Sequence, residues 1–165
     1  MEIIDFLKES NAIEGEYSKI ALEDSITAWQ YAYKKIIKNN ELLRTDIILG
    51  IHKRLMKRLN ERIAGKFRKV QVGVMTKEGF KEAKHFSKIK EEIMNWTIIF
   101  NKNVREDYQD WKGNHIWFEH IHPFEDGNGR TGRILMNIQR LKLGLPILII
   151  HTGKEQQDYY KWFKE

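Results

Sequence analysis

The sequence predicts a mainly α-helical fold, a single-domain helical bundle with one β-hairpin. Only two prolines occur in 165 residues, so long stretches can form uninterrupted helix. Apolar residues recur at helical spacing through most of the chain. Hydrophobic residues make up 41% and aromatic residues 12%, which is enough for a buried core and excludes a disordered chain. The length is typical of one domain.

An amphipathic helix is predicted at the N-terminus. Ile3, Leu7, Ser10 and Glu14 lie at i, i+4, i+7 and i+11, so they share one helical face. Gly15 follows as a natural C-terminal stop. We therefore expect this helix to span residues 1–16, ahead of the remainder of the chain, residues 17–165.

Five apolar stripes predict the helices that follow, and each marks a face that packs against another helix. His115 lies on the fourth stripe and is interpreted as a core residue rather than a metal ligand. In chain order the stripes are Leu22–Ile36, Ile48–Leu59, Phe86–Phe100, Val104–Phe118 and Ile134–Leu141, the last ended by Gly144 and Pro146.

One segment, Gly65–Thr76, departs from the helical pattern. Val70, Val72 and Val74 alternate with other residues, among them Gln71, which is strand periodicity. The segment is predicted to form a β-hairpin. Two interpretations are open: an edge that receives an extended peptide as an added strand, or an ordinary connection.

The composition limits the class of protein. The absence of cysteine excludes disulfides, thiolate metal sites and a cysteine nucleophile. No apolar run approaches the ~18 residues of a membrane span, and the start of the chain does not resemble a signal peptide. We expect a cytoplasmic protein without membrane contact. The net charge is +6, with a basic stretch from Lys53 to Lys69 that suits either an anionic partner or a solvated surface.

Residues 122–133, HPFEDGNGRTGR, form the segment in which we expect the chemistry. Pro123 ends the preceding helix near His120, and a new helix is expected to start near Arg130. The backbone of Gly127–Gly129 can adopt unusual angles, so successive N–H groups can converge on an anion. The N-terminus of the following helix adds further donors and partial positive charge.

Charged side chains surround this expected anion site. Arg130 and Arg133 are three residues apart, so both can lie on one side of the helix and bind a polyphosphate. Asp126 offers an oxygen ligand that suits Mg²⁺ together with phosphate oxygens and water. His122 is largely neutral at cellular pH, as a general base must be. The residues indicate a nucleotide site with a base beside a phosphate.

The segment HPFEDGNGRTGR matches the signature HPFx[D/E]GNGRxxR of the Fic (Fido) family at every specified position, and the chain resembles that family. The preceding HIWFEHI, His115–Ile121, is similar to the helix that leads into the motif. The helical stripes and the single hairpin are similar to the helical Fic fold with its flap. The resemblance covers most of the chain.

This resemblance implies a protein adenylyltransferase, which moves AMP from ATP to a Ser, Thr or Tyr hydroxyl of a target protein; the target can be another protein or the chain itself. Gly129 favours AMP transfer over the Doc-like kinases, which have Lys there; such a kinase is an alternative. The resemblance implies that His122 is the base and that Asp126 is a Mg²⁺ ligand. The phosphates would be bound by Gly127, Asn128 (backbone and side chain), Gly129 and Arg130, and the γ-phosphate by Arg133. Val70, Gln71 and Val72 would belong to the flap that positions the target.

A second motif, Ser10–Gly15 or SNAIEG, resembles the family's inhibitory pattern [S/T]xxxE[G/N]. The resemblance implies that Glu14 pairs with Arg133 and takes the place of the γ-phosphate. Residues 1–16 would then inhibit a catalytic unit formed by residues 17–165. The same glutamate could orient a water molecule, so de-AMPylation, alone or together with AMP transfer, is an alternative activity.

The C-terminal segment Gln156–Tyr160 resembles the adenine side of the family's site, although Gln156 and Gln157 stand where relatives often have Asn or Arg. Tyr159 and Tyr160 therefore either contact adenine or belong to the core. An oligomer is compatible with the sequence. The non-enzymatic alternative is a basic nucleic-acid-binding module, for which Lys53–Lys69 is the support; we consider nucleic acid binding less favoured than ATP binding.

Overall fold

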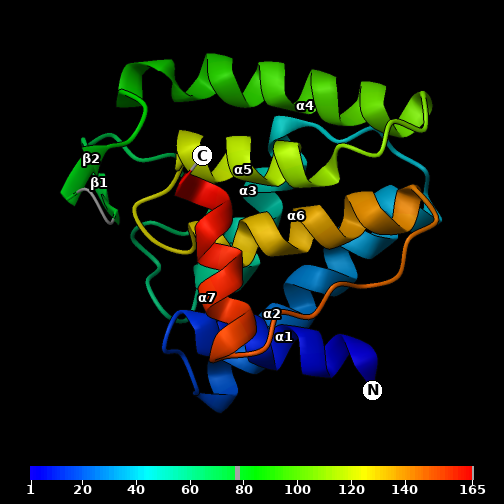
Figure 1. Ribbon diagram of the computed structural model, residues 1–165, viewed down its shortest axis with the longest axis horizontal. Helices are drawn as coiled ribbons and strands as arrows, with labels where there is room; N and C mark the ends of the chain where they lie inside the picture. The colour runs from blue at the N-terminus through cyan, green and yellow to red at the C-terminus, as the bar shows by residue number, and fades with distance from the viewer. Residues whose placement is uncertain (77–78, 165) are drawn as a thin grey trace.

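The computed structural model, shown in Figure 1, describes residues 1–76 and 79–164 and is mainly helical. A single two-stranded sheet accompanies the helices in this part of the chain. The elements are α1 (Glu2–Ile13), α2 (Lys19–Ala32), the π-helical η1 (Tyr33–Lys38), α3 (Thr45–Met56), β1 (Gly73–Thr76), β2 (Gly79–Glu82), the 3-10 helix η2 (Phe86–Lys88), α4 (Ile89–Arg105), α5 (Trp111–Ile121), α6 (Asn128–Lys142), α7 (Lys154–Lys161) and the 3-10 helix η3 (Trp162–Lys164).

Helix α6 lies in the middle of the molecule, with α4 and α5 on one side and α1 on the other (Figure 1). It packs against all of the first five α-helices. Because it is surrounded in this way, α6 buries polar as well as apolar side chains, including Arg130, Thr131 and Arg133. The helix that follows the motif loop therefore carries its charged groups into the interior.

The main hydrophobic core joins the helices around α6, and the ring of Trp96 packs against Phe100 and Phe118 within it. A smaller apolar cluster holds α1 and α7 against α6; it consists of Ile13, Met136, Ile150 and Tyr159. Full burial of a side chain such as Ile13 contributes about 1.5–3 kcal/mol. The end of α1 that carries the predicted inhibitory glutamate is therefore anchored by apolar contact.

The predicted N-terminal helix is confirmed. Helix α1 ends at Ile13, Glu14 caps it, and Gly15 takes the left-handed conformation with φ of 71°. Helix α2 then begins after Ser18, whose side chain accepts a hydrogen bond from Ala21 N at 3.1 Å. Glycine at the stop and serine at the cap fix both boundaries locally.

The fourth stripe does not form one helix, so that prediction is wrong. Helix α4 ends at Arg105 and α5 begins at Trp111. Asp107 between them has φ of 52°, and Asp110 Oδ1 accepts a hydrogen bond from Gly113 N at 3.0 Å. The N-cap at Asp110 starts a new helix in a new direction, although the apolar spacing continues across the break.

The hairpin also differs from its predicted place. Strands β1 and β2 pair antiparallel, with Gly73 opposite Glu82 and Thr76 opposite Gly79. Residues 65–72 precede β1. Arg68 N donates to Pro123 O at 3.0 Å, in the motif loop and not in a neighbouring strand. Residues 77–78 and the side chains of Val74, Met75 and Thr76 lie outside the described residues.

Within residues 1–76 and 79–164, no helix combines the length and the apolar character needed to cross a bilayer.

Candidate nucleotide site

The loop between α5 and α6 carries His122 in an unusual backbone conformation. His122 caps α5 with φ of 49° and ψ of 63°, the left-handed region that non-glycine residues rarely occupy. Burial, followed by the charge of Arg68, lowers the pKa of His122 below its ordinary value. The imidazole is therefore neutral at physiological pH and can accept a proton.

Phe124 fixes the middle of this loop. Its ring is fully buried and stacks on His52 with ring centroids 3.7 Å apart. This packing holds the middle of the loop against α3. His52 was missed by the sequence reasoning because nothing in its local pattern separates it from an ordinary core residue of α3.

His52 acts as a hydrogen-bonded support for the loop. Gly65 N donates to His52 Nδ1 at 3.0 Å, so Nε2 carries the proton and donates to Asp126 O at 2.8 Å. Burial lowers the pKa of His52 to about 4, which keeps the ring neutral. The support thus joins α3, the segment before the hairpin and the motif loop.

The side chain of Asn128 is used within the loop. Its Oδ1 accepts from Phe124 N at 2.8 Å, and its Nδ2 donates to Phe124 O, also at 2.8 Å. This differs from the phosphate-binding role expected for the side chain. The amide closes the loop, and both of its polar atoms are bonded to the backbone of Phe124.

Backbone donors gather at the N-terminus of α6. Gly127 has φ of 80°, and a Cβ on it would lie 2.9 Å from Met56 Sδ, so any other residue would strain the backbone and displace the Met56 side chain. Helix α6 starts at Asn128, two residues before the predicted start at Arg130. The first N–H groups of a helix have no partner within it, which makes this end a site for an anion.

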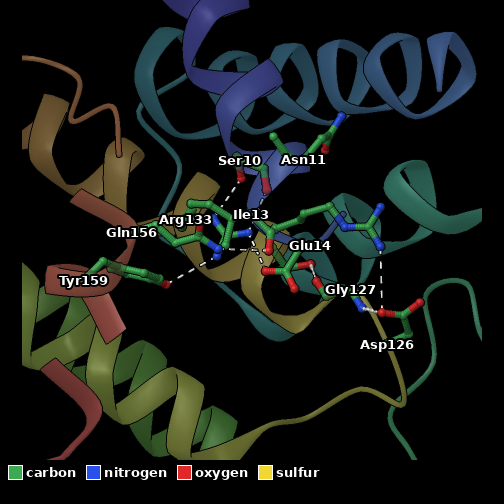
Figure 2. Close-up of polar contacts among 12 residues, drawn as sticks. Ser10, Asn11, Ile13, Glu14, Asp126, Gly127, Arg133, Gln156 and Tyr159 are labelled. Carbon is green, nitrogen blue, oxygen red and sulfur yellow. Dashed lines mark hydrogen bonds and ion pairs between the residues drawn. The ribbon is translucent and has the colours of Figure 1, made fainter. Parts of the chain in front are cut away.

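Arg133 connects the motif helix to α1, as Figure 2 shows. Its guanidinium donates from Nη2 to Glu14 Oε1 at 2.6 Å and to Ser10 O at 2.9 Å, and from Nε to Ser10 Oγ at 2.9 Å. The predicted pairing of Glu14 with Arg133 is present. The Glu14 carboxylate also lies against Gly129, where a Cβ would collide with it.

Glu119 of α5 is a second carboxyl group on the same face of α6, and the sequence reasoning missed it. Its Oε1 is buried against Gly132, one turn after Gly129. Burial raises the pKa of Glu119 to about 7, against the opposing effect of the Arg133 charge. Gly129 and Gly132 lack side chains and so leave room for the carboxyl groups of Glu14 and Glu119; this pair of glycines is the sequence signal that could have indicated them.

Arg130 and Arg133 are both buried but contact different partners. Arg130 Nη2 lies 3.5 Å from Met56 Sδ and 3.8 Å from Asp126 Oδ1. Two of its nitrogens, Nε and Nη1, have no hydrogen-bond partner in the described part of the chain. Arg130 thus keeps two buried donors without a protein partner, whereas Arg133 is bonded to α1.

Asp126 is the candidate metal ligand. Its side chain is 69% exposed, and Oδ1 accepts from Gly127 N at 2.7 Å. Among residues 1–76 and 79–164, no group of three or more acidic or histidine side chains is placed to hold a metal. Asp126 fits a Mg²⁺ ion that takes its remaining oxygen ligands from phosphates and water, which is the usual manner of Mg²⁺ binding.

The two C-terminal tyrosines occupy different environments. Tyr159 is buried, its hydroxyl lies 2.8 Å from His115 Nε2, and Arg133 Nη1 donates to that hydroxyl at 3.4 Å. Tyr159 is therefore a core residue behind Arg133, the second of the two expected alternatives. Tyr160 is 43% exposed, and its hydroxyl accepts from Gln156 Nε2 at 3.0 Å.

The expected target-positioning residues lie at the base of the hairpin. Val70 is exposed. Gln71 Nε2 donates to Ala83 O at 2.8 Å, which joins the segment before β1 (the first limb of the hairpin) to the segment after β2 (the second limb). Val72 O accepts from Ala83 N at 3.0 Å and extends the pairing beyond β1. These residues precede the strands rather than forming them.

The basic stretch is partly neutralised by acidic neighbours. Arg58 Nε donates to Asp24 Oδ1 at 2.7 Å, and Arg62 Nη2 donates to Glu125 Oε2 at 2.6 Å. Arg68 is buried. These arginines serve the fold, which leaves chiefly the lysines of the stretch for an anionic partner.

Curated relatives share the sequence over most of this chain. The chain is 29% identical to "Protein adenylyltransferase Fic" of Nematostella vectensis over 84% of its length, and 30% identical to the protein of that name from Drosophila grimshawi over 83%. It covers 32% and 28% of those proteins, so it spans about a third of the length of these relatives.

Solved structures share the fold. A Fic domain containing signaling protein from Bacteroides thetaiotaomicron superposes with a TM-score of 0.79 at 17% identity, covering 98% of this chain and 69% of that one. Fic-1 from C. elegans gives a TM-score of 0.72 at 19% identity, covering 96% and 54%. The Fic/DOC family model matches residues 42–139, which include the motif. Because this match spans more than half of the sequence, the chain belongs to the Fic/DOC family.

Proposed function

We propose that the chain is a protein adenylyltransferase, which moves AMP from ATP to a Ser, Thr or Tyr hydroxyl of a protein. The observation that carries the proposal is the neutral imidazole of His122 in the loop that leads to the N-terminus of α6. This arrangement supplies a base beside an anion site. Relatives that are named protein adenylyltransferases support the choice of reaction.

In the proposed reaction, His122 takes the proton of the target hydroxyl as the oxygen bonds to the α-phosphorus of ATP. The bond from that phosphorus to the α,β-bridging oxygen breaks, and pyrophosphate leaves. Backbone N–H groups at Gly127–Gly129 and the guanidinium of Arg130 hold the phosphates. The rate enhancement then comes from positioning and from donors fixed in advance around the developing charge.

Asp126 would hold Mg²⁺ against the phosphates, and the ion would neutralise part of their charge when bound. The exposed side chain of Asp126 suits this role because it can reach an ion at the mouth of the site. The loop backbone fixes its position, since His52 holds the Asp126 carbonyl at 2.8 Å.

Glu14 would keep the basal activity low. Its carboxylate is bonded to Arg133, the group proposed to bind the γ-phosphate, and lies over Gly129 at the start of α6. Phe6 and Leu7 are buried in the main core, so α1 is bound along its length. Residues 1–16 would therefore act as an inhibitory segment on the catalytic unit 17–165 without leaving the bundle, and relief would require the Glu14 side chain to move.

Hydrolysis of an AMP–protein bond is the second candidate activity. The Glu14 side chain is 39% exposed, so water reaches its carboxylate at the start of α6. A carboxylate in that place could orient a water molecule toward the phosphorus. The two activities would then share the loop and differ in whether Glu14 stays in place.

The test uses a cell lysate, isotopically labelled ATP and the Glu14→Gly protein, followed by mass spectrometry of the modified proteins. We expect a mass gain of AMP on a hydroxyl side chain of a lysate protein or of the chain itself, with His122→Ala as the matched inactive control. A mass gain of phosphate, or no gain while MgATP is bound, would contradict the proposal.

A further inference from the structure

Arg68 is a buried arginine that neither the motif nor the proposed mechanism uses. Its side chain belongs to the segment before β1, and the residue is 2% exposed. In the described part of the chain, no carboxylate lies within ion-pair distance of it. A buried guanidinium without an acidic partner needs hydrogen bonds for its donors, because burial of an unpaired charge is costly.

Arg68 gives these donors to backbone carbonyls from three parts of the chain. Nε donates to His122 O at 2.7 Å and Nη2 donates to Ile121 O at 3.3 Å, both at the end of α5. Nη1 donates to Val70 O at 3.0 Å, on the limb that leads into β1. Nη2 also donates to Lys84 O, on the limb that follows β2.

The backbone at His122 requires such support. A non-glycine residue in the left-handed region costs roughly 1–2 kcal/mol, and it persists only where its surroundings hold it. The last carbonyls of α5 have no partner within the helix and carry partial negative charge. The planar fork of Arg68 satisfies two of these carbonyls, and Arg68 N adds a bond to Pro123 O at 3.0 Å.

We propose that Arg68 is a positioning residue: by bonding the carbonyl of His122 and the carbonyls of both hairpin limbs, it holds the catalytic imidazole at a fixed place relative to the hairpin. This inference rests on the proposed function, in which the hairpin presents the target hydroxyl to His122. Displacement of a reacting group by about 1 Å can cost on the order of 10²-fold in rate.

The charge of Arg68 has a second effect on the imidazole. The charged groups that influence His122 are Arg68, before the hairpin, Glu14 at the end of α1 and Asp126 in the loop. Burial is the largest cause of the lowered pKa of His122 and Arg68 is the next, while the two carboxylates act in the opposite direction. Arg68 thus helps to keep the base unprotonated.

The test compares two variants. Arg68→Lys keeps the positive charge but loses the planar guanidinium that bonds several carbonyl groups, and Arg68→Met loses both the charge and the guanidinium. Arg105→Gln is the matched control, since Arg105 is exposed and forms an ion pair with its neighbour Glu106. The kcat and KM for MgATP are measured in the Glu14→Gly background, per amount of folded protein, and the His122 titration is followed by NMR.

We expect kcat to fall by about 10²-fold in both Arg68 variants with KM for MgATP unchanged, because α6 still binds the nucleotide. His122 titrates at higher pH in Arg68→Met than in Arg68→Lys. Wild-type kcat in a folded Arg68→Lys protein, or a rise in KM without a fall in kcat, would overturn the proposal.

Failure of the proposed function gives a different result. It would appear as no AMP transfer by the Glu14→Gly protein with native Arg68. The positioning role is then judged by NMR alone. If the His122 titration and the hydrogen exchange at the ends of the hairpin are the same in Arg68→Met as in the protein with native Arg68, the positioning role is overturned.

Discussion

Glu14 Oε1 lies 2.6 Å from Arg133 Nη2, although 119 residues separate the two positions. The pair joins the end of α1 to the helix that follows the motif loop. Ser10 adds two further bonds to the same guanidinium. The N-terminal helix thus occupies the arginine that we propose for the γ-phosphate.

Replacement of Glu14 by glycine should raise AMP transfer. Hydrogen bonds to charged groups are worth about 1.5–3 kcal/mol, which corresponds to an increase of about 10- to 100-fold if the pair limits productive ATP binding. Incorporation of labelled AMP measures the rate. Glu2→Gln, at the exposed start of α1, is the control and should leave it unchanged; equal labelling by the folded Glu14→Gly protein would refute the inhibitory role.

His122→Ala should lower AMP transfer by about 10²–10⁴-fold, the usual effect of removing a general base. Binding of MgATP, measured by calorimetry, should persist because Arg130 and the start of α6 remain. His151→Ala is a suitable control, since this histidine is exposed and pairs with Glu155 at 2.8 Å. Full activity without His122 would remove the imidazole from the mechanism.

Gly127→Ala should destabilise the fold more than Gly144→Ala does. Both glycines have positive φ, 80° and 72°, so both alanine variants carry a backbone strain of roughly 1–2 kcal/mol. Only Gly127 is crowded, because its Cβ would lie 2.9 Å from Met56 Sδ, whereas nothing lies within 4 Å at Gly144. Denaturant unfolding should show a further loss of about 1–3 kcal/mol for Gly127→Ala. Equal losses would contradict the close packing.

Glu119→Gln should stabilise the chain above pH 7. The pKa of Glu119 is near 4.5 when unfolded and about 7 in the fold, so the folded state holds the extra proton between these values. The free energy of unfolding therefore falls as pH rises from 4.5 to 7, by an amount on the order of a few kcal/mol.

The glutamine variant removes this titration, so its advantage over the wild type should grow across that range and then level off. Urea unfolding at several pH values measures it. Glu91→Gln, on the exposed face of α4, should run parallel to the wild type. A constant difference between Glu119→Gln and the wild type would show that Glu119 is not held neutral.

Local sequence signals predicted much of the fold and the site. Gly15 indicated the end of the first helix, and the apolar spacing indicated most of the others. The break at Asp110 and the place of the hairpin were not predicted, because a side-chain cap and the anchoring of Arg68 decided them. The cap at Asp110 is a local contact with Gly113, whereas the place of the hairpin depends on carbonyl groups that Arg68 meets only in the folded chain.

The sequence by itself determined the family motif, the helical class and the glutamate of α1, because these follow from residue type and spacing within short segments. Only the tertiary structure decided that Asn128 closes the loop, that Tyr159 lies behind Arg133, and that His52, Arg68 and Glu119 support or adjoin the site. The physical reason is that a buried polar group must find partners, and those partners come from distant segments that meet only when the helices pack.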